Sequence, residues 1–564
     1  MDPSSPHWHS RTEAPLVVQK SETIHWDDTT DVLVVGLGGA GVCAALEALE
    51  QNVQVAAVDR FCGGGATAMS GGVYYGGGGT EQQQKAGFED TPEEMYNYLK
   101  LEAQDVVSED TLREFCTSSS DNLKWLEKYG VEFSAALCPV KTSYPSDKYF
   151  LYYSGNELQP AYSSQAKPAP RGHRAVGKGL SGPNFFTPLK ESALTRGLKL
   201  YSYSEVRRLV LDQDKKIIGV ELLKLPENPK AMGRLAKINR KFSSTLTLLS
   251  PKRALKLARE ADAILEKNGE RILIGVSKSV ILSAGGFSHN RDMVAYHAPK
   301  YINAAPLGSI GCNGSGIRLG QSVGSRVERM DNISAWLNIL PPSAFAKGII
   351  VNGLGERIVS EDCYGAKIGY HVVEDNNGRA FIILDRKLYW QAMRQALPGP
   401  GKLFRTQCAP ALLSLLFGAT KAKTVEELAV KCKMQPDRLK DSIEHYNRAI
   451  EGKESTRFAK HVDYLSPLVD ASFYALDISV TSKTYFFPTI SLGGLAVAEN
   501  TGQVISIDGG TIPKLYAAGR NAIGVASNTY VSGLSISDCV FSGRRAGRYA
   551  SVESASQDSK TEHL

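Results

Sequence analysis

The sequence contains no closely spaced cysteine pair, although it has nine cysteines. They are scattered along the chain, odd in number and never arranged as Cys-x-x-Cys. This distribution argues against a disulfide framework and against the common cysteine-based metal sites. We therefore predict no metal site, and the unpaired cysteines favour a reducing, intracellular compartment.

Long apolar runs and a strong charge bias are also missing. The longest apolar stretch, 411–419, is far shorter than the ~18 residues that suggest a membrane span. Residues 1–15 have no apolar core like that of a signal peptide. The net charge is only +6 over 564 residues, which argues against a nucleic-acid partner. We expect a cytoplasmic protein, or one attached to the periphery of a membrane.

Glycine, in contrast, is abundant. The 53 glycines fall mostly in short clusters, which suits a backbone that approaches a ligand closely at several places. Hydrophobic residues make up 42% of the chain and charged residues 22%, as in soluble globular proteins. Apolar strands, glycine turns and amphipathic helices alternate between the two polar ends. This alternation predicts an α/β fold.

The segment 226–270 interrupts the predicted strands. Its part 230–267 carries ten Lys or Arg against three acidic residues, and apolar residues recur there at helical spacing. A basic amphipathic helix could contact an anionic membrane surface. A solvated helical excursion that covers the domain is the commoner structure for such a segment.

The first candidate site is the turn Gly36-Leu-Gly-Gly-Ala-Gly41. It follows a predicted buried strand, 31–35, and opens a predicted helix, 42–51. A second predicted strand, 53–58, ends at Asp59. A glycine turn in this strand–turn–helix–strand context is specific for dinucleotide binding and predicts a Rossmann-like domain.

Each residue of the turn has a physical role in this prediction. Gly36 allows the tight turn, Gly38 lets the backbone meet a pyrophosphate, and Gly41 lets helix and strand pack closely. The helix N-terminus supplies N–H donors to the phosphates, and Asp59 can accept hydrogen bonds from a ribose. The predicted cofactor contacts here are Gly36, Gly38, Gly39, Ala40, Gly41 and Asp59.

The stretch Cys62-Gly-Gly-Gly-Ala-Thr-Ala-Met-Ser-Gly-Gly72 resembles the second FAD-binding segment of the fumarate reductase/succinate dehydrogenase flavoprotein superfamily. Further matches follow in the order of the superfamily, namely Pro170-Arg-Gly-His-Arg174, Ala284-Gly-Gly-Phe287, 311–320, 491–494 and Leu515-Tyr-Ala-Ala-Gly-Arg520. The resemblance spans about residues 30 to 550. It implies FAD as the cofactor. Covalently flavinylated members carry a histidine in the 62–72 segment, and none occurs here, so it also implies non-covalent binding.

The resemblance extends the set of implied FAD contacts beyond the glycine turn. These residues are Ala66, Thr67, Ser70, Gly71, Gly72, Val206, Ala284, Gly285, Gly519, Arg520, Leu534 and Ser535. Arg520 stands where fumarate reductases usually carry a flavin-contacting glutamate. The ribityl contact at this position is therefore expected to differ.

The glycine clusters also predict how the domains are arranged. They are frequent up to about residue 300, sparse over 301–487, and frequent again over 488–552. We expect a discontinuous FAD-binding domain of 25–300 and 488–552, interrupted by an inserted α+β substrate domain of 301–487. Helices such as 409–417 and 425–448 are predicted in the insert. The polar ends, 1–24 and 553–564, are predicted to be flexible tails.

Two charged groups that dicarboxylate reduction requires are missing. The superfamily places a histidine just before the glycine pair that corresponds to Gly493-Gly494, and Phe487-Pro-Thr-Ile-Ser-Leu contains none. The stretch Arg357-Ile-Val-Ser-Glu-Asp-Cys-Tyr364 ends in a tyrosine where fumarate reductases carry their proton-donating arginine. Fumarate chemistry is therefore disfavoured.

Tyr364 and the stretch Tyr530-Val-Ser-Gly-Leu-Ser535 instead resemble the 3-ketosteroid dehydrogenases of the same superfamily. The Tyr-x-Ser-Gly form is closer to the 4-(5α)-dehydrogenases than to the 1-dehydrogenases. The resemblance implies that the Tyr530 hydroxyl and a backbone N–H near Gly533 or Leu534 hold the 3-keto oxygen. It implies that Tyr364 takes the α proton, with Ser532 as a relay. A packed loop aromatic is the alternative for Tyr364.

The predicted function is thus the flavin-dependent desaturation of a 3-keto steroid or a steroid-like triterpenoid. Its partners are a hydrophobic small-molecule substrate and an external electron acceptor, since the sequence has no haem motif or iron–sulfur cysteine cluster. Tyr144 to Glu157 could add an aromatic wall to the pocket. The alternatives are a reductase of an enone or a fumarate-type substrate, and a non-enzymatic flavoprotein that docks on a membrane or a partner.

Overall fold

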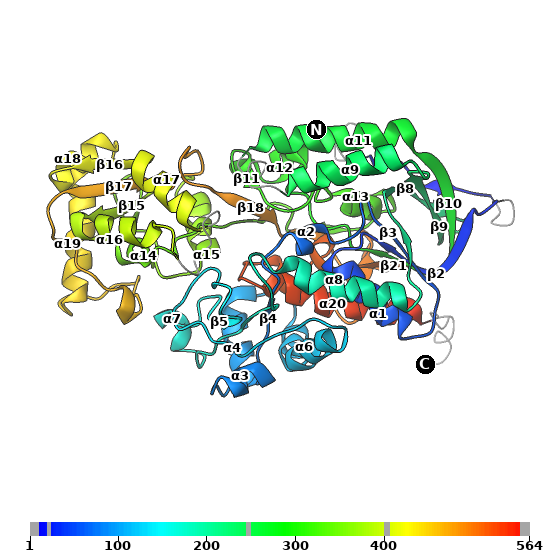
Figure 1. Ribbon diagram of the computed structural model, residues 1–564, viewed down its shortest axis with the longest axis horizontal. Helices are drawn as coiled ribbons and strands as arrows, with labels where there is room; N and C mark the ends of the chain where they lie inside the picture. The colour runs from blue at the N-terminus through cyan, green and yellow to red at the C-terminus, as the bar shows by residue number, and fades with distance from the viewer. Residues whose placement is uncertain (1–10, 20–23, 244–249, 400–406, 553–564) are drawn as a thin grey trace.

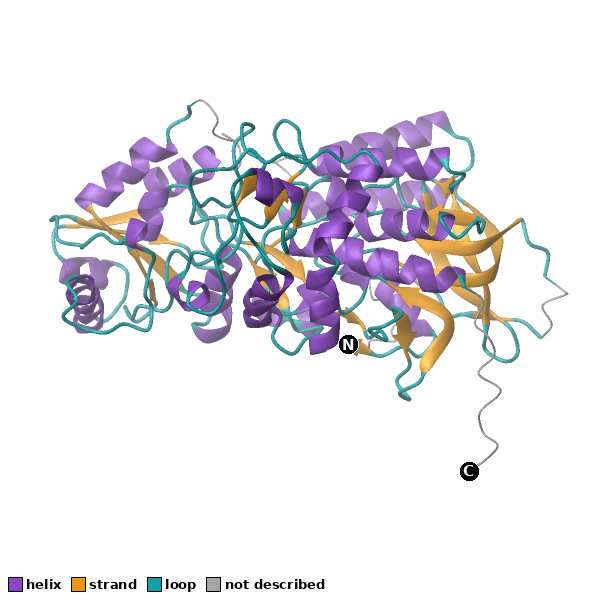
Figure 2. Ribbon diagram, turned by 90° about the horizontal axis from the view of Figure 1, so that it is seen from below, coloured by secondary structure: helices purple, strands orange, loops and turns teal. Residues whose placement is uncertain are grey.

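The computed structural model describes residues 11–19, 24–243, 250–399 and 407–552 (Figure 1). A large, mostly buried sheet occupies one end of the molecule and a smaller sheet the other, and helices cover both (Figures 1 and 2). The two parts are joined by the segments around β11 (Ala305–Pro306) and β18 (Pro488–Ser491). This α/β arrangement is the predicted fold class.

Nine of the described strands form the large sheet. Its centre is parallel, with β2 (Asp28–Val35) between β3 (Val55–Val58) and β10 (Glu270–Leu282). β21 (Thr511–Ala517) pairs with β10 in parallel, although it lies more than two hundred residues later in the chain. The remaining strands are β1 (Leu16–Val17), β7 (Lys199–Tyr201), β8 (Ser204–Leu211), β9 (Ile217–Lys224) and β20 (Gln503–Ile505).

The central strands read as continuous apolar runs because both faces of the sheet are covered. Val32, Leu33 and Val34 of β2 are fully buried. On one face lie α1 (Gly39–Leu49) and α20 (Leu534–Ser551), which pack against each other along much of their length. Their contact places the beginning of α20 beside the glycine turn.

The small sheet is antiparallel and has the order β14 (Ile349–Asn352), β15 (Ala380–Asp385), β17 (Phe473–Asp477) and β16 (Ala419–Ala422). One predicted helix of this part, 425–448, is wrong in extent. The chain forms two helices instead, α18 (Val425–Lys431) and α19 (Pro436–Ile450). The break occurs because Lys433 has a φ of 55° and Pro436 starts a new helix.

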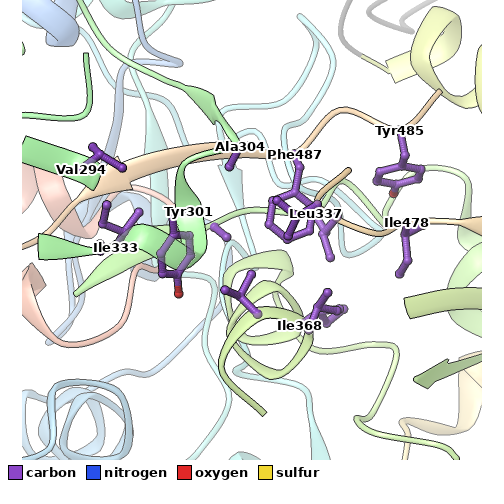
Figure 3. Packing of buried hydrophobic residues seen from close by; sticks show 14 of the residues in the cluster. Val294, Tyr301, Ala304, Ile333, Leu337, Ile368, Ile478, Tyr485 and Phe487 are labelled. Carbon is purple, nitrogen blue, oxygen red and sulfur yellow. The ribbon is translucent and has the colours of Figure 1, made fainter. Parts of the chain in front are cut away.

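One cluster of buried side chains runs through both sheets, and Figure 3 shows the part between them. It contains Tyr301, Ile333, Ile368 and Phe487, whose side chains converge from separate elements. All strands of the small sheet lie within 301–487, but β18 begins at residue 488 and pairs with β11 and with β13 (Ile333–Ala335). The division into 25–300 with 488–552 and 301–487 therefore remains our proposal.

The remaining described elements surround these sheets. The strands are β4 (Val73–Tyr75), β5 (Leu151–Tyr152), β6 (Gly172–Arg174), β12 (Val327–Glu328) and β19 (Gly494–Leu495). The helices are α2 (Gly65–Ala68), α3 (Glu81–Lys85), α4 (Pro92–Ala103), α5 (Glu109–Thr117), α6 (Ser119–Lys128), α7 (Pro160–Ser163), α8 (Gly182–Thr195), α12 (Arg291–His297), α13 (Ser315–Ser322), α14 (Ser343–Lys347), α15 (Gly365–Tyr370), α16 (Arg386–Ala396) and α17 (Ala409–Phe417).

The basic segment 226–270 forms α9 (Pro229–Phe242) and α11 (Pro251–Asn268), which lie against β8 and β9 (Figure 1). Their apolar residues point inward and form one buried cluster with Leu223 and Leu225 of the sheet. The apolar face of this segment is therefore packed on the protein itself, and a peripheral membrane contact through its basic residues stays a prediction. The alternative prediction, helices that cover the domain, describes the structure. Among the described residues, no helix is both long and apolar enough to cross a membrane.

The prediction of a flexible tail over 1–24 is wrong for its described part. Leu16 and Val17 form β1, which pairs in parallel with β8 at the edge of the large sheet. Glu13 forms an ion pair with Arg271 of β10 at 2.5 Å. The rest of the predicted tails, 1–10, 20–23 and 553–564, lies outside the described residues.

A buried charge network supports the loop that leads to Tyr364. Glu361 is fully buried and accepts hydrogen bonds from Arg357 at 2.8 and 3.0 Å, while Lys460 lies 2.9 Å from it. Burial alone would raise the pKa of Glu361, but the two cations hold it below its ordinary value. Arg357 is thus ion-paired with Glu361 and does not line the large cavity described below.

We predict that Glu361→Ala lowers the free energy of unfolding by about 3 to 5 kcal/mol, because it leaves two buried cations without their anion. Urea denaturation followed by circular dichroism measures the change. The matched control is Glu444→Ala, which removes a half-exposed i,i+4 partner of Arg448 and should cost less than about 1 kcal/mol. Equal, small effects of the two variants would contradict the prediction.

Candidate active site

A cavity of about 1530 Å³ runs along the junction of the large sheet and the segments that lead to the small one. Most of the sequence-predicted site residues lie on its wall. Those that line it are Gly36, Gly38, Gly39, Ala40, Asp59, Ala66, Thr67, Ser70, Gly71, Val206, Ala284, Gly285, Tyr364, Arg520, Tyr530, Ser532, Gly533 and Ser535. Residues separated by as many as five hundred positions therefore share one space.

The glycine turn closes against the end of β10. Gly36 has a φ of +97°, and a Cβ atom there would lie 2.6 Å from the Cα of Ala284. A Cβ atom on Gly38 would meet nothing within 4 Å, so the backbone at this point is open to a ligand. The first turn of α1 presents its amides here, which suits a pyrophosphate.

Asp59 ties the turn to the segment that follows it. Its carboxylate accepts hydrogen bonds from the amides of Leu37 at 3.0 Å, Phe61 at 2.8 Å and Gly63 at 3.0 Å. A carboxylate has about four acceptor positions, so Asp59 can still accept a hydroxyl from the cavity. Its structural role in shaping the turn was not visible in the sequence.

Four predicted cofactor contacts, Gly41, Gly72, Gly519 and Leu534, are not among the residues that line the cavity, and their contact with FAD stays a prediction. A Cβ atom on Gly41 would lie 2.0 Å from the carbonyl oxygen of Gly36, and one on Gly72 2.4 Å from that of Ser181. A Cβ atom on Gly519 would lie 2.8 Å from the Cβ of Ala40. The Leu534 side chain is fully buried in a hydrophobic cluster. These residues shape the wall by close packing.

Tyr364 and Tyr530 meet at one end of the cavity, with ring centroids 6.2 Å apart. Tyr364 immediately precedes α15, and its amide donates to the Asn156 Oδ1 atom at 2.5 Å. Burial raises the pKa of the Tyr364 hydroxyl well above its ordinary value, and the neighbouring Tyr530 adds to this, while the nearby polar groups of Ser532 and Trp336 oppose the rise.

Tyr530 lies just before α20. Burial raises the pKa of its hydroxyl, and the nearby Arg520 guanidinium and the backbone amide of Gly533 oppose the rise. The Leu534 amide donates to the Val531 carbonyl oxygen at 3.0 Å and is not available to a ligand. Of the two predicted backbone donors, Gly533 is the one that the geometry favours.

Ser532 lies between two tyrosine hydroxyls. Its Oγ atom lies 3.2 Å from the hydroxyl of the fully buried Tyr152, and Ser532 also lowers the pKa of the Tyr364 hydroxyl. Ser154 fixes the backbone of Ser532 by donating to its carbonyl oxygen at 3.1 Å. The sequence placed Tyr152 in an aromatic stretch, 144–157, but gave no signal that its hydroxyl would reach this serine.

Tyr144, from the same stretch, lines the cavity elsewhere. Its hydroxyl donates to the carbonyl oxygens of Gly71 at 2.8 Å and Gly179 at 3.0 Å, so its ring packs on Gly71. Other wall residues carry no motif that could have identified them. They include Trp336, Asn338, Leu413, Val480, Tyr485 and Phe487 toward the small sheet, and Asn239, Phe242 and Ala254 from α9 and α11.

The Arg520 side chain also lines the cavity and donates to the Sγ atom of Cys312 at 3.4 Å. The position where fumarate reductases carry a glutamate is thus occupied by a cation in this chain. Within the described ranges, no group of three or more His, Cys, Asp or Glu side chains is arranged to hold a metal ion.

A glycine turn at a helix N-terminus, an acidic residue at the end of the next strand and a long cavity that reaches buried tyrosines fit an adenine dinucleotide with a large second ring system. The sequence model of the "FAD binding domain" family matches residues 31–536, so the chain belongs to this family. FAD is the cofactor, and the protein is an FAD-dependent oxidoreductase.

Individual relatives refine this classification. The chain is 39% identical over 510 residues to "3-oxo-5-alpha-steroid 4-dehydrogenase" of Comamonas testosteroni, covering 89% of this chain and 95% of that protein. Among solved structures, a 3-ketosteroid-delta4-(5alpha)-dehydrogenase from Rhodococcus jostii RHA1 in complex with 4-androstene-3,17-dione has a TM-score of 0.78 at 28% identity, covering 96% of this chain and 100% of that one. A 3-ketosteroid delta1-dehydrogenase from Sterolibacterium denitrificans, with a TM-score of 0.65 at 19% identity over 93% of this chain and 99% of that one, shares the fold.

Proposed function

We propose that the protein desaturates a 3-keto steroid or a steroid-like triterpenoid beside its ketone. The observation that carries this proposal is the group formed by Tyr364, Tyr530, Ser532 and Gly533 on the wall of the cavity that holds the glycine turn. The similarity to the Comamonas and Rhodococcus proteins supports the substrate class. Arg357 is paired with Glu361, so the chain lacks a free arginine there for fumarate chemistry.

The hydroxyl of Tyr530 and the amide of Gly533 are the groups proposed to hold the 3-keto oxygen. Both donors lie just before α20, and the amide of Gly533 lowers the pKa of the Tyr530 hydroxyl. A ketone oxygen between two such donors is stabilised as it gains enolate character. The adjacent α carbon then becomes acidic enough to lose a proton to a positioned side chain.

Tyr364 is proposed to take that α proton. Ser532 lowers the pKa of the Tyr364 hydroxyl and lies 3.2 Å from the Tyr152 hydroxyl, so the proton can be passed along a short chain of hydroxyls. FAD, when bound, supplies the acceptor for the hydride from the β carbon. Loss of the α proton and the β hydride leaves an α,β-unsaturated ketone, and the electrons then pass to an external acceptor.

We propose that the bond formed lies between carbons 4 and 5, because Tyr530-Val-Ser-Gly533 has the form found in the 4-(5α)-dehydrogenases. We also propose that FAD is held non-covalently, since 62–72 contains no histidine. Arg520 is proposed to contact the flavin from the cavity wall.

One experiment tests the reaction. The purified protein, with its flavin spectrum confirmed, is mixed without oxygen with a 5α-saturated 3-keto steroid. We expect the flavin to bleach and the product, mapped by mass and NMR, to be the 4-ene-3-one. A 1-ene product would contradict the proposed bond. No bleaching by any 3-ketosteroid, with reoxidation of reduced flavin by fumarate or an enone, would contradict the direction and substrate class.

The two tyrosines should be needed for bleaching and not for FAD binding. We predict that Tyr364→Phe and Tyr530→Phe each lower the rate of anaerobic flavin reduction by at least about a hundredfold, since each removes a hydroxyl that acts in the transition state. Stopped-flow absorbance measures the rate, and the flavin content per protein serves as the control. Full activity in either variant would remove that residue from the mechanism.

The reaction should speed up toward alkaline pH. A base acts in its deprotonated form, and burial holds the pKa of Tyr364 well above the usual ~10, so little of that form exists near neutrality. Between about pH 7 and 9 we expect flavin reduction at low substrate concentration to accelerate by up to about tenfold per pH unit. A rate that is flat over this range would place the base elsewhere.

We expect the Tyr152 hydroxyl to affect the rate of flavin reduction through its hydrogen bond with Ser532. We predict that Tyr152→Phe slows flavin reduction by about tenfold and alters its solvent isotope effect, because the serine loses its second hydrogen-bond partner. Tyr153→Phe is the matched control, since the Tyr153 ring packs edge-on against Phe88. In a Ser532→Ala background, Tyr152→Phe should have no further effect, and full additivity would refute the coupling.

A further inference from the structure

The helices α9 and α11 cover the sheet and also reach the cofactor cavity. Asn239 and Phe242 at the end of α9 and Ala254 near the start of α11 lie on its wall. Phe242 packs at 4.9 Å against the ring of His289, which lines the same space. The segment 226–270 therefore contributes side chains to the cavity.

The position of these residues identifies the part of the ligand that they face. The proposed catalytic tyrosines lie beside α15 and the start of α20, and the glycine turn lines the same cavity. Phe242 and Ala254 belong to the same buried cluster as Phe61, which follows Asp59 by two residues. α9 and α11 lie over β8 and β9, away from α15 (Figure 1). An FAD with its pyrophosphate at the glycine turn and its flavin toward the tyrosines would extend its adenosine half toward these helices.

Ion pairs fasten the helices to the strands that hold the cofactor. Arg60, which follows Asp59 and lines the cavity, pairs with Asp262 of α11. Arg207 of β8 pairs with Glu266 of α11 at 2.6 Å. Arg60 and Arg207 are largely buried, so water screens these pairs less than it screens pairs on the surface.

We propose that α9 and α11 form a latched cover over the adenosine half of FAD. Phe242 supplies an aromatic surface and Asn239 an amide for the adenine, and the pair Arg60–Asp262 holds the cover closed. FAD leaves or enters when the latch opens. This inference rests on FAD binding alone and does not depend on the steroid reaction.

The latch is tested by the rate at which FAD leaves the holoenzyme. The variant Asp262→Asn removes the charge that pairs with Arg60, and release is followed as the rise in flavin fluorescence after dilution. We expect release at least tenfold faster than in the wild type. The matched control is Glu260→Gln on the same helix, whose carboxylate pairs with Arg234 of α9 at 3.5 Å within the cover itself. Its release rate should equal that of the wild type.

The adenosine assignment is tested by comparing FAD with FMN, which lacks adenosine. Apoprotein from the wild type and from Phe242→Ala is titrated with each flavin. We expect Phe242→Ala to weaken FAD binding at least tenfold and to leave FMN binding unchanged, so that the preference for FAD shrinks. Equal weakening of both flavins, or unchanged FAD release in Asp262→Asn, would overturn the proposal. If the steroid reaction fails while these differences appear, only the proposed function is wrong.

Discussion

The close approach of α1 and α20 is the constraint on which the site depends. Two glycines of α20 make it possible, since a Cβ atom on Gly543 would lie 2.5 Å from the carbonyl oxygen of Ala40, and one on Gly547 2.3 Å from that of Ala44. Larger side chains there would push the helices apart. Because α20 begins directly after Tyr530 and Ser532, its distance from α1 also sets the distance between the proposed catalytic hydroxyls and the pyrophosphate turn. Backbone packing between α1 and α20 thus sets the position of the proposed catalytic residues.

The polar groups at the proposed catalytic end of the cavity are buried. Burial disfavours their ionised forms, but it also strengthens the hydrogen bonds that they make. Hydroxyls of Tyr152, Tyr364 and Tyr530 lie in surroundings that disfavour their ionised forms, so each has a raised pKa. The same low polarity strengthens hydrogen bonds to a developing enolate. Ser532, which lowers the pKa of Tyr364, and the Gly533 amide, which lowers that of Tyr530, offset part of the penalty. The arrangement suits a reaction in which a proton moves along hydroxyls while no side chain carries a lasting charge.

Much of this site could be predicted from the sequence because its elements are local. The glycine turn, the strand that ends at Asp59 and the start of α20 are each encoded within a few neighbouring residues. The partners that complete them come from distant segments and carry no local signature. Tyr152 reaches Ser532 across 380 positions, and Glu361 takes Lys460 as a partner across ninety-nine. The predicted helix 425–448 failed for a different reason, because apolar spacing continues across the break at Lys433 and Pro436.

The basic segment 226–270 shows why charge counts must be read with their positions. Its excess of Lys and Arg suggested an anionic surface as a partner. The side chains that hold the segment against the rest of the protein by ion pairs are, however, acidic. Asp262 faces Arg60 in the loop after β3, Glu266 faces Arg207 of β8, and the apolar residues between them pack on β9. Most of the cations are therefore left on the outward side, where they keep the cover solvated. The charge of α9 and α11 suggested a partner outside the protein. In the structure these two helices are held by ion pairs and apolar contacts with the segments that line the cofactor cavity.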